Sequence, residues 1–313
     1  MTDVRITHIG GPTALIEFGG WRLLTDPTFD PAGERYGFGW GTSSRKLTDP
    51  AITPGELPPI DAVLLTHDHH GDNLDRAGRA LLPSAGTVVT TTSGARRLGG
   101  TARGLAPWAA TRLEAPGRPT IEVTATPARH GPPLSRPIVG GVSGARRLGG
   151  TARGLAPWAA TRLEAPGRPT IEVTATPARH GPPLSRPIVG GVVGFALRWA
   201  GQRHGVLWIT GDTVLHSGLR RVADRFAVSV VLLHLGAVRF PVTGPLRYTM
   251  TAREGVELCR LVRARTVVPV HYEGWAHFRQ DGDAVDGAFA TAPDGIRRSL
   301  RRLPVGTPAT VTV

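Results

Sequence analysis

The chain has 313 residues, a formal net charge of +13, 40% hydrophobic residues and one cysteine, Cys259. This composition supports a packed globular core, while the lone cysteine excludes a disulfide framework and a cysteine-built zinc site. No apolar run approaches the roughly 18 residues of a membrane span, and the first residues resemble no secretory signal, so we expect a cytoplasmic protein with no membrane span.

The first part of the chain alternates apolar and polar residues in short runs separated by glycines, which predicts an antiparallel β-meander. Residues 27–59 are rich in Pro, Gly and Ser, which predicts a long loop. Ser93 is the predicted cap of a helix that runs to Arg97. The predicted strands of this part are residues 4–9, 14–18, 21–24, 61–65 and 87–90.

Residues 93–142 and 143–192 are identical at all fifty positions. Repeats that stack into solenoids drift in sequence and need at least about three copies, so two identical copies indicate a recent tandem duplication or an artefact of sequence assembly. Removing one copy leaves 263 residues, which suits a single domain. We therefore predict one domain over 1–313, with one copy surplus to the fold. Any fifty-residue deletion within the repeat restores the same parent sequence.

Strands and helices alternate in the rest of the chain, which predicts sheets covered by helices. Thr251 and Glu254 have the spacing of a capping box, so a helix is expected to begin there. The predicted strands are residues 120–126 and their twin 170–176, then 192–199, 205–210, 228–233 and 266–270.

Histidine and aspartate gather directly after the predicted strand 61–65, in the sequence THDHHGDNLD. Residues i and i+2 of an extended segment point to the same side, so His67 and His69 can face one ion. Imidazole and carboxylate ligands suit Zn²⁺ and related transition metals. Asp72 could supply a further oxygen ligand or hold a metal-bound water.

Three further strand ends carry similar groups: PARHG with His180 and its twin His130, TGDT with Asp212, and VPVHYEGW with His271. Each motif is weak alone, but loops at one edge of a sheet can bring distant residues together. His234 also ends a predicted strand and suits either the core or the cleft. A structural role is the preferred reading of His277, with a place in the substrate pocket as the alternative.

Five motifs in order, LTDP at 24–27, THDHHGDNLD, PARHG, TGDT and VPVHYEGW, resemble those of the metallo-β-lactamase-fold hydrolases. The resemblance is greatest to the branch that contains L-ascorbate-6-phosphate lactonase-like proteins and N-acylphosphatidylethanolamine phospholipase D. It covers the chain outside the extra copy. It implies an α/β fold, the four-layer αββα sandwich, with one or two divalent metal ions at the sheet edge.

The resemblance also implies site roles. His67, His69 and the PARHG histidine would hold a first metal, and Asp72 and His271 a second. Asp212 would bridge the two metals and support a hydroxide nucleophile whose pKa is lowered toward about 7. Asp26 would support a ligand indirectly. The predicted metal ligands are His67, His69, Asp72, His180, Asp212 and His271, and the predicted catalytic residues are Asp72, Asp212 and His70.

The sequence departs from the family pattern at two places. The usual H-x-H-x-D-H is one residue longer here and has Asn73 where a histidine is expected, so either His70 takes that role or the second site is weakened. Zn is the expected metal, with Mn or Mg as alternatives, because an Asn oxygen suits those ions better. The duplication offers two equivalent histidines. We favour His180 over His130 because its copy continues directly into the strand at 192–199.

The sequence thus predicts a metal-dependent hydrolase that attacks an ester, lactone, amide or phosphodiester with metal-bound hydroxide. A catalytically impaired scaffold or binding protein, disrupted by the duplication, is the second hypothesis, and a nuclease is the third. The basic residues are scattered in pairs, and each repeat copy contributes seven Arg and two Glu. The charge therefore favours a small-molecule substrate, anionic ones included, over nucleic acid.

Overall fold

The alternating runs at the start of the chain form an antiparallel meander, as their pattern predicts. Strand β2 (Thr13–Phe18) pairs with β1 (Asp3–Gly10) on one side and β3 (Trp21–Thr25) on the other. These strands belong to an eight-stranded sheet in the order β18-β1-β2-β3-β6-β7-β11-β8. Its other strands are β6 (Ala62–Leu64), β7 (Val88–Thr90), β8 (Ala102–Arg103), β11 (Ala152–Gly154) and β18 (Pro308–Thr312).

A second eight-stranded sheet has the order β10-β9-β12-β13-β14-β15-β16-β17, with a further pairing between β10 and β12. The predicted strands 192–199 and 205–210 correspond to β14 and β15, which form an antiparallel pair, and β15, β16 and β17 run parallel. The strands are β9 (Ala110–Ala115), β10 (Arg118–Thr126), β12 (Trp158–Leu163), β13 (Ile171–Pro177), β14 (Val193–Trp199), β15 (Val206–Ile209), β16 (Val228–His234) and β17 (Thr266–Val270).

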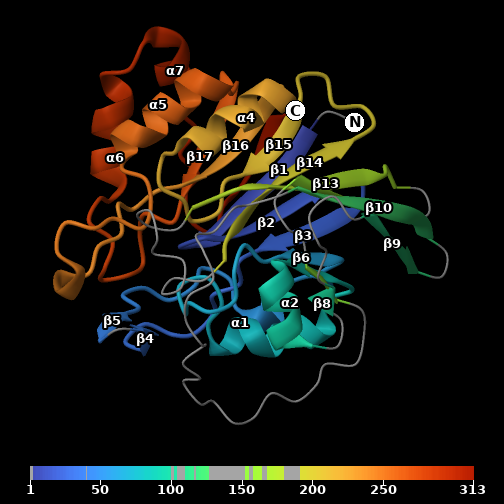
Figure 1. The fold of residues 1–313 in the computed structure, drawn as a ribbon, viewed down its shortest axis with the longest axis horizontal. Coiled ribbons are helices and arrows are strands. Elements are labelled where there is room, and N and C mark those ends of the chain that lie inside the picture. The colour runs from blue at the N-terminus through green and yellow to red at the C-terminus, as the bar shows by residue number, and fades with distance from the viewer. Residues whose placement is uncertain are drawn as a thin grey trace.

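The two sheets pack face to face, and helices cover their outer faces (Figure 1). Ile16 and Leu64 of the first sheet share a fully buried cluster with Phe195 and Val230 of the second. This arrangement confirms the predicted αββα sandwich. The structure is a computed structural model that describes residues 3–39, 41–99, 102–103, 110–115, 118–126, 152–154, 158–163, 168–179 and 191–313. In these ranges no helix combines the length and hydrophobicity that crossing a bilayer requires.

Helices lie where apolar residues at helical spacing face a sheet. Helices α4, α5 and α6 pack on the second sheet, and α1 and α2 lie over the first (Figure 1). The described helices are α1 (Arg76–Leu81), α2 (Thr92–Leu98), α4 (Ser217–Arg225), α5 (Ala252–Val262), α6 (Gly282–Ala290) and α7 (Asp294–Ser299), with 3-10 turns at Pro54–Glu56, Leu82–Ser84 and Pro241–Thr243.

Two helix starts test the cap predictions. The capping box of Thr251 and Glu254 is confirmed at the start of α5, where each side chain bonds to the other's backbone N–H. Ser93 is not the cap of α2. Thr91 takes that role, because its hydroxyl accepts a hydrogen bond from the Gly94 N–H at 2.9 Å.

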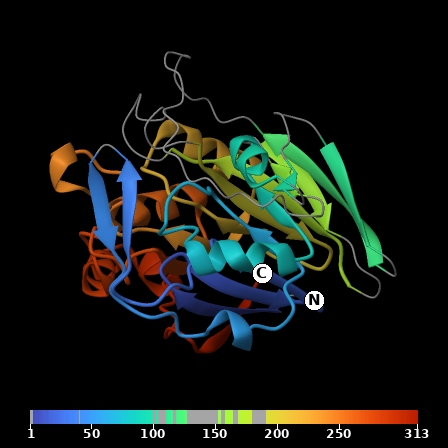
Figure 2. The ribbon, with the colours of Figure 1, turned by 90° about the horizontal axis from the view of Figure 1, so that it is seen from below.

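The prediction of one long loop over residues 27–59 is wrong in part. Strands β4 (Arg35–Gly39) and β5 (Thr42–Arg45) form an antiparallel ribbon that stands at one edge of the molecule (Figure 2). Gly39 and Gly41 have positive φ angles and make the turn. Two glycines in β4 and the wholly polar sequence TSSR of β5 leave no apolar alternation by which the sequence would reveal these strands. Phe38 is buried all the same, at 8% exposure.

The two repeat copies form the same hairpin in the same register. In the first copy, Val123 of β10 lies opposite Thr111 of β9. In the second, Val173 of β13 lies opposite Thr161 of β12. Val123 also lies opposite Thr161, where β10 pairs with β12. The same Val–Thr register therefore occurs in three strand pairs at this end of the sheet: β9 with β10, β10 with β12, and β12 with β13.

The second copy supplies the strands that pair with the rest of the domain. Strand β11 lies parallel to β7, and β13 pairs with β14 over seven residues from Ile171 to Pro177. The first copy supplies α2, which follows β7 directly, and then β8, β9 and β10. Strand β8 pairs with β11, so the strands of the first copy extend both sheets beyond the strands of the second.

Candidate metal centre

The predicted site residues follow strands that end at the same edge of the two sheets. His67 comes after β6, Asp212 after β15 and His271 directly after β17. Parallel strands place their carboxyl ends together. Two hydrogen bonds join the sheets there, from Val193 N to Thr66 O at 3.2 Å and from His271 N to Gly11 O at 2.8 Å.

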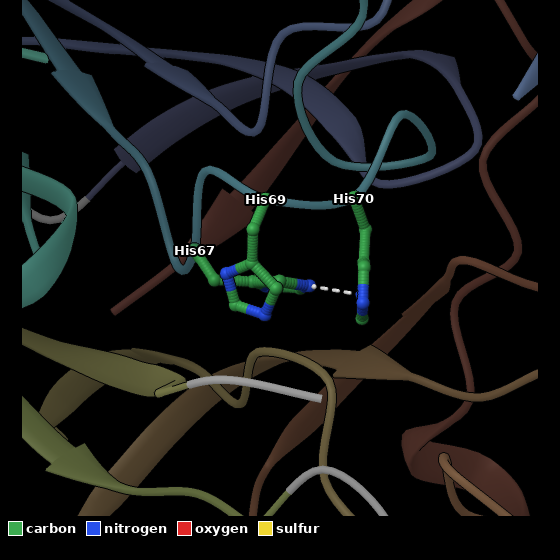
Figure 3. Close-up of side chains that lie close together, drawn as sticks. All are labelled: His67, His69 and His70. Atoms are coloured by element: carbon green, nitrogen blue, oxygen red, sulfur yellow. Dashed lines mark hydrogen bonds between the residues drawn. The ribbon is translucent and has the colours of Figure 1, made fainter. Parts of the chain in front are cut away.

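Three histidines form the first group of the site. His67, His69 and His70 each offer a ring nitrogen, and these nitrogens lie within 4.8 Å of one another. Figure 3 shows the rings directed toward one another from the loop after β6. Nε2 of His67 lies 3.3 Å from Nδ1 of His70. The structure thus brings His67 and His69 together, as the sequence predicts, and adds His70.

Asp72, Asp212 and His271 form the second group, and all three are buried. Nε2 of His271 lies 3.3 Å from Oδ2 of Asp212 and 3.5 Å from Oδ2 of Asp72. His271 adopts a left-handed conformation with φ of 58°, and its Nδ1 lies 3.4 Å from the Leu235 carbonyl. The backbone therefore turns this imidazole toward the two carboxylates.

Burial and mutual attraction set the pKa values in the second group. Burial raises the pKa of Asp212 to about 6. Burial would lower the pKa of His271, but the negative charges of Asp212 and Asp72 outweigh it and raise that pKa to about 9. Burial likewise opposes ionisation of Asp72, yet hydrogen bonds from His271 and His277 hold its pKa well below the ordinary value.

Asp26 supports the first group through Thr66. Its Oδ1 accepts hydrogen bonds from the Thr66 backbone N–H at 2.7 Å and from the Thr66 hydroxyl at 2.9 Å. The same hydroxyl oxygen lies 3.1 Å from Nδ1 of His67. Since the hydroxyl donates its proton to Asp26, it can only accept from His67. The lone pair of His67 is therefore on Nε2.

His234 lies on the other side of Asp26. Its Nε2 is 3.5 Å from Asp26 Oδ2, and its Nδ1 is 3.3 Å from the Thr210 hydroxyl. Burial lowers the pKa of His234 to about 3 and raises that of Asp26 to about 8. The sequence suits His234 to either the core or the cleft. In the structure its side chain is fully buried and lies beside the site.

Two contacts of the site could not be read from the sequence. Asp68 is bound by Arg97 of α2, and His277 lies 2.9 Å from Asp72 through Nε2. The sequence marked His277 only as a candidate for the substrate pocket or for a structural role. The partners are 29 and 205 residues apart, so no local spacing signals these contacts.

Asn73 belongs to neither group formed by the described part of the chain. It is fully buried, and its carboxamide has no hydrogen-bond partner among those residues. The family pattern has a histidine at the position of Asn73, and the sequence left His70 as one candidate to replace it. In the structure, His70 lies with His67 and His69. The predicted ligand His180 and its twin His130 lie outside the described residues.

The family profile of the β-lactamase superfamily domain matches residues 21–151 and 135–272, which is more than half of the chain. The chain belongs to the metallo-β-lactamase superfamily. The two matched segments overlap within the repeat, where the same fifty residues occur twice.

Several known proteins share parts of this superfamily pattern. A UPF0173 metal-dependent hydrolase of Methanoregula boonei is 30% identical over 101 residues, which is 32% of this chain and 40% of that protein. The match thus spans less than half of the relative. The structure of an isothiocyanate hydrolase from Delia radicum gut bacteria has a TM-score of 0.67 at 17% identity, covering 99% of this chain and 100% of its own.

The structure of Igni18, a metallo hydrolase from Ignicoccus hospitalis, has a TM-score of 0.61 at 17% identity and covers 99% of both chains. At such low identity these two structures support the metallo-β-lactamase fold alone.

Proposed function

We propose that this chain is a metal-dependent hydrolase acting on an ester, lactone, amide or phosphodiester. The observation that carries the proposal is the presence of two clusters of candidate metal ligands at the shared edge of the two sheets. One cluster has three imidazoles, and the other has two carboxylates and one imidazole. Membership of the metallo-β-lactamase superfamily and the metal-dependent hydrolase among its relatives support it.

The chemistry of the donor set fits one or two divalent cations. Imidazole nitrogen and carboxylate oxygen are ligands for Zn²⁺, and carboxylate oxygen also suits Mn²⁺ and Mg²⁺. Asp26, Asp72 and Asp212 are all buried, and buried carboxylates require compensating charge. Oδ1 of Asp72 accepts no hydrogen bond within the described residues. We propose zinc because imidazole predominates in the first group.

The residues divide between two cation positions. His67 and His69 would hold the first cation together with His70, or with His180 as the sequence predicts. Asp72 and His271 would hold the second. Asp212 lies beside His271 and would contribute to both, as in the bridging role that the superfamily resemblance implies.

When bound, such cations lower the pKa of a coordinated water and polarise the bond to be cleaved. The chain's own residues supply orientation and burial. Asp26 and Thr66 fix the lone pair of His67 on Nε2. Phe38 packs against His70 with ring centroids 5.3 Å apart and shields that side of the site. Within the superfamily, the order of the five motifs favours the branch of L-ascorbate-6-phosphate lactonase-like proteins and N-acylphosphatidylethanolamine phospholipase D.

Elemental analysis combined with a panel of hydrolase substrates tests the proposal. We expect purified protein to carry about one to two transition-metal ions, and Asp212→Ala and His67→Ala to lose both metal and activity. His204→Ala is the matched control, because His204 precedes β15 whereas Asp212 follows it. Full activity in a metal-free preparation would overturn the mechanism. Metal uptake by the 263-residue parent but not by the long chain would instead support the impaired-scaffold hypothesis.

A further inference from the structure

We infer that His277 is a positioning residue that fixes the orientation of the Asp72 carboxylate, and that Ser44 of the β4–β5 ribbon fixes His277 in turn. This inference rests on the proposed role of Asp72 as a metal ligand. It assigns a function to the β4–β5 ribbon and to His277, which lies outside the five motifs that resemble those of the superfamily.

The three side chains form a continuous hydrogen-bonded series. Nδ1 of His277 lies 2.6 Å from the Ser44 hydroxyl oxygen, and Nε2 lies 2.9 Å from Oδ2 of Asp72. Ser44, His277 and Asp72 are 4%, 3% and 2% exposed. Hydrogen bonds buried to this extent hold their partners in one geometry, because breaking one leaves a polar atom unsatisfied.

The chemistry of the partners fixes the direction of each hydrogen bond. An ionised carboxylate only accepts, so Nε2 of His277 carries the proton that Asp72 receives. Nδ1 of the neutral ring is then an acceptor, and the Ser44 hydroxyl donates to it. The tautomer of His277 is therefore set from both sides.

A short backbone ladder places Ser44 opposite His277. Lys46 forms an antiparallel bridge with Trp275. Leu47 N donates to Gly274 O at 2.8 Å, and Ala276 N donates to Arg45 O at 3.0 Å. These bonds register the chain after β5 against the loop after β17.

Aromatic side chains hold the imidazole ring of His277. Phe240 stacks on it at 5.1 Å with an interplanar angle of 9°. Phe38 and Phe278 approach it with centroids at 4.9 Å and 4.8 Å. The ring is therefore fixed by packing as well as by its two hydrogen bonds.

As a consequence, the two carboxylate oxygens of Asp72 have different surroundings. Oδ2 is occupied by His277 and lies near His271, whereas Oδ1 is buried and accepts no hydrogen bond from the described residues. Holding one oxygen leaves the other free to bind a cation in a fixed direction. Partners of this kind typically change metal affinity by about 10–100-fold.

Cobalt titration of metal-free protein, followed by the visible absorption of bound Co²⁺, tests the inference. His277→Phe keeps a ring among the aromatic neighbours but removes both nitrogens, whereas His277→Gln retains an N–H donor. We expect the second equivalent of Co²⁺ to bind about 10–100-fold more weakly to His277→Phe. His277→Gln is expected to restore most of the affinity, and Ser44→Ala to lose part of it.

The inference is overturned if His277→Phe binds both equivalents of Co²⁺ with wild-type affinity. It is also overturned if His277→Phe and His277→Gln lose Co²⁺ affinity equally, because the ring would then have a packing role only. Ser44→Ala supplies the same test if His277→Phe does not fold, and unchanged affinity there overturns the inference. If the wild-type chain itself takes up no Co²⁺, the proposed function fails instead.

Discussion

Arg97 binds both carboxylate oxygens of Asp68, the residue between His67 and His69, with its Nε 2.8 Å from Oδ2. The Asp68 side chain is 2% exposed and that of Arg97 is 48% exposed. Burial alone would raise the pKa of Asp68, but the hydrogen bonds from Arg97 outweigh it and hold that pKa below its ordinary value. Helix α2 thus restrains the loop that carries the histidines.

Replacing Arg97 by alanine is expected to lower the free energy of unfolding at pH 7 by about 1–3 kcal/mol, because it leaves a buried carboxylate without its hydrogen-bond donor. Urea unfolding measures the change. The folded-state pKa of Asp68 lies below its unfolded value, so the pair contributes above pH 4 and its contribution is lost as the pH falls. Arg96→Ala, at the exposed neighbouring position, should be nearly neutral. Equal effects of the two variants would contradict this role.

Stability should also decline in mild acid because of His216. Its Nδ1 accepts a hydrogen bond from the Gly218 N–H at 3.1 Å and caps α4. Burial, followed by the charges of Arg179 and Arg221, lowers its pKa to about 4. The unfolded chain therefore binds more protons between pH 6.5 and pH 4, and stability falls as the pH falls through that range, by about 1–2 kcal/mol.

Thermal or urea unfolding of His216→Asn across the same pH range isolates this contribution. Asparagine keeps an acceptor at the cap but does not titrate. The variant should therefore lose less stability than the wild type between pH 7 and pH 4.5. Parallel pH profiles would show that His216 does not titrate as described.

Asp212→Asn is expected to have opposite effects on the metal-free and metal-loaded protein. Burial raises the pKa of Asp212, so its charge costs stability when no cation is bound. The neutral amide should raise metal-free stability by about 1–2 kcal/mol. A metal at about 100 times its Kd adds roughly 2.7 kcal/mol to the wild type, and this gain should be lost in the variant. Melting curves with a chelator and after zinc addition measure both effects; a variant that gains as much from zinc as the wild type would refute them.

Deleting residues 101–150, which yields the same sequence as deleting 143–192, is expected to leave the metal content unchanged. Both groups of candidate ligands lie outside the repeat, and the second copy pairs with β7 and β14. Metal analysis and thermal melting of the two chains compare them directly. A sharp rise in metal uptake in the shorter chain would mean that the duplication impairs the site.

Much of the fold follows from local sequence patterns. Apolar alternation identifies the meander of β1 to β3, and the capping box of Thr251 and Glu254 identifies the start of α5. The β4–β5 ribbon is missed because β4 contains two glycines and β5 is wholly polar, so neither strand shows apolar alternation. The cap of α2 is misplaced by two residues, since Thr91 and Ser93 are both competent caps and only the course of the chain selects one.

The candidate site is predictable where ligands follow strands. His67, Asp212 and His271 stand at strand ends, and the topology of the sheets brings those ends together. The contacts of Asp68 with Arg97 and of Asp72 with His277 depend on how α2 and the loop after β17 pack. Tertiary packing of this kind leaves no spacing rule in the sequence, so these partners emerge only from the structure.

The register shared by β9, β10, β12 and β13 has a consequence for how this gene can change. Recombination between the two identical stretches would add or remove whole fifty-residue units in frame. Each added unit could dock as another ribbon on its predecessor at the sheet margin, as β10 docks on β12. Chains of differing copy number would then vary in width at one border of the domain, while the strand ends that carry the two groups of candidate ligands stayed the same.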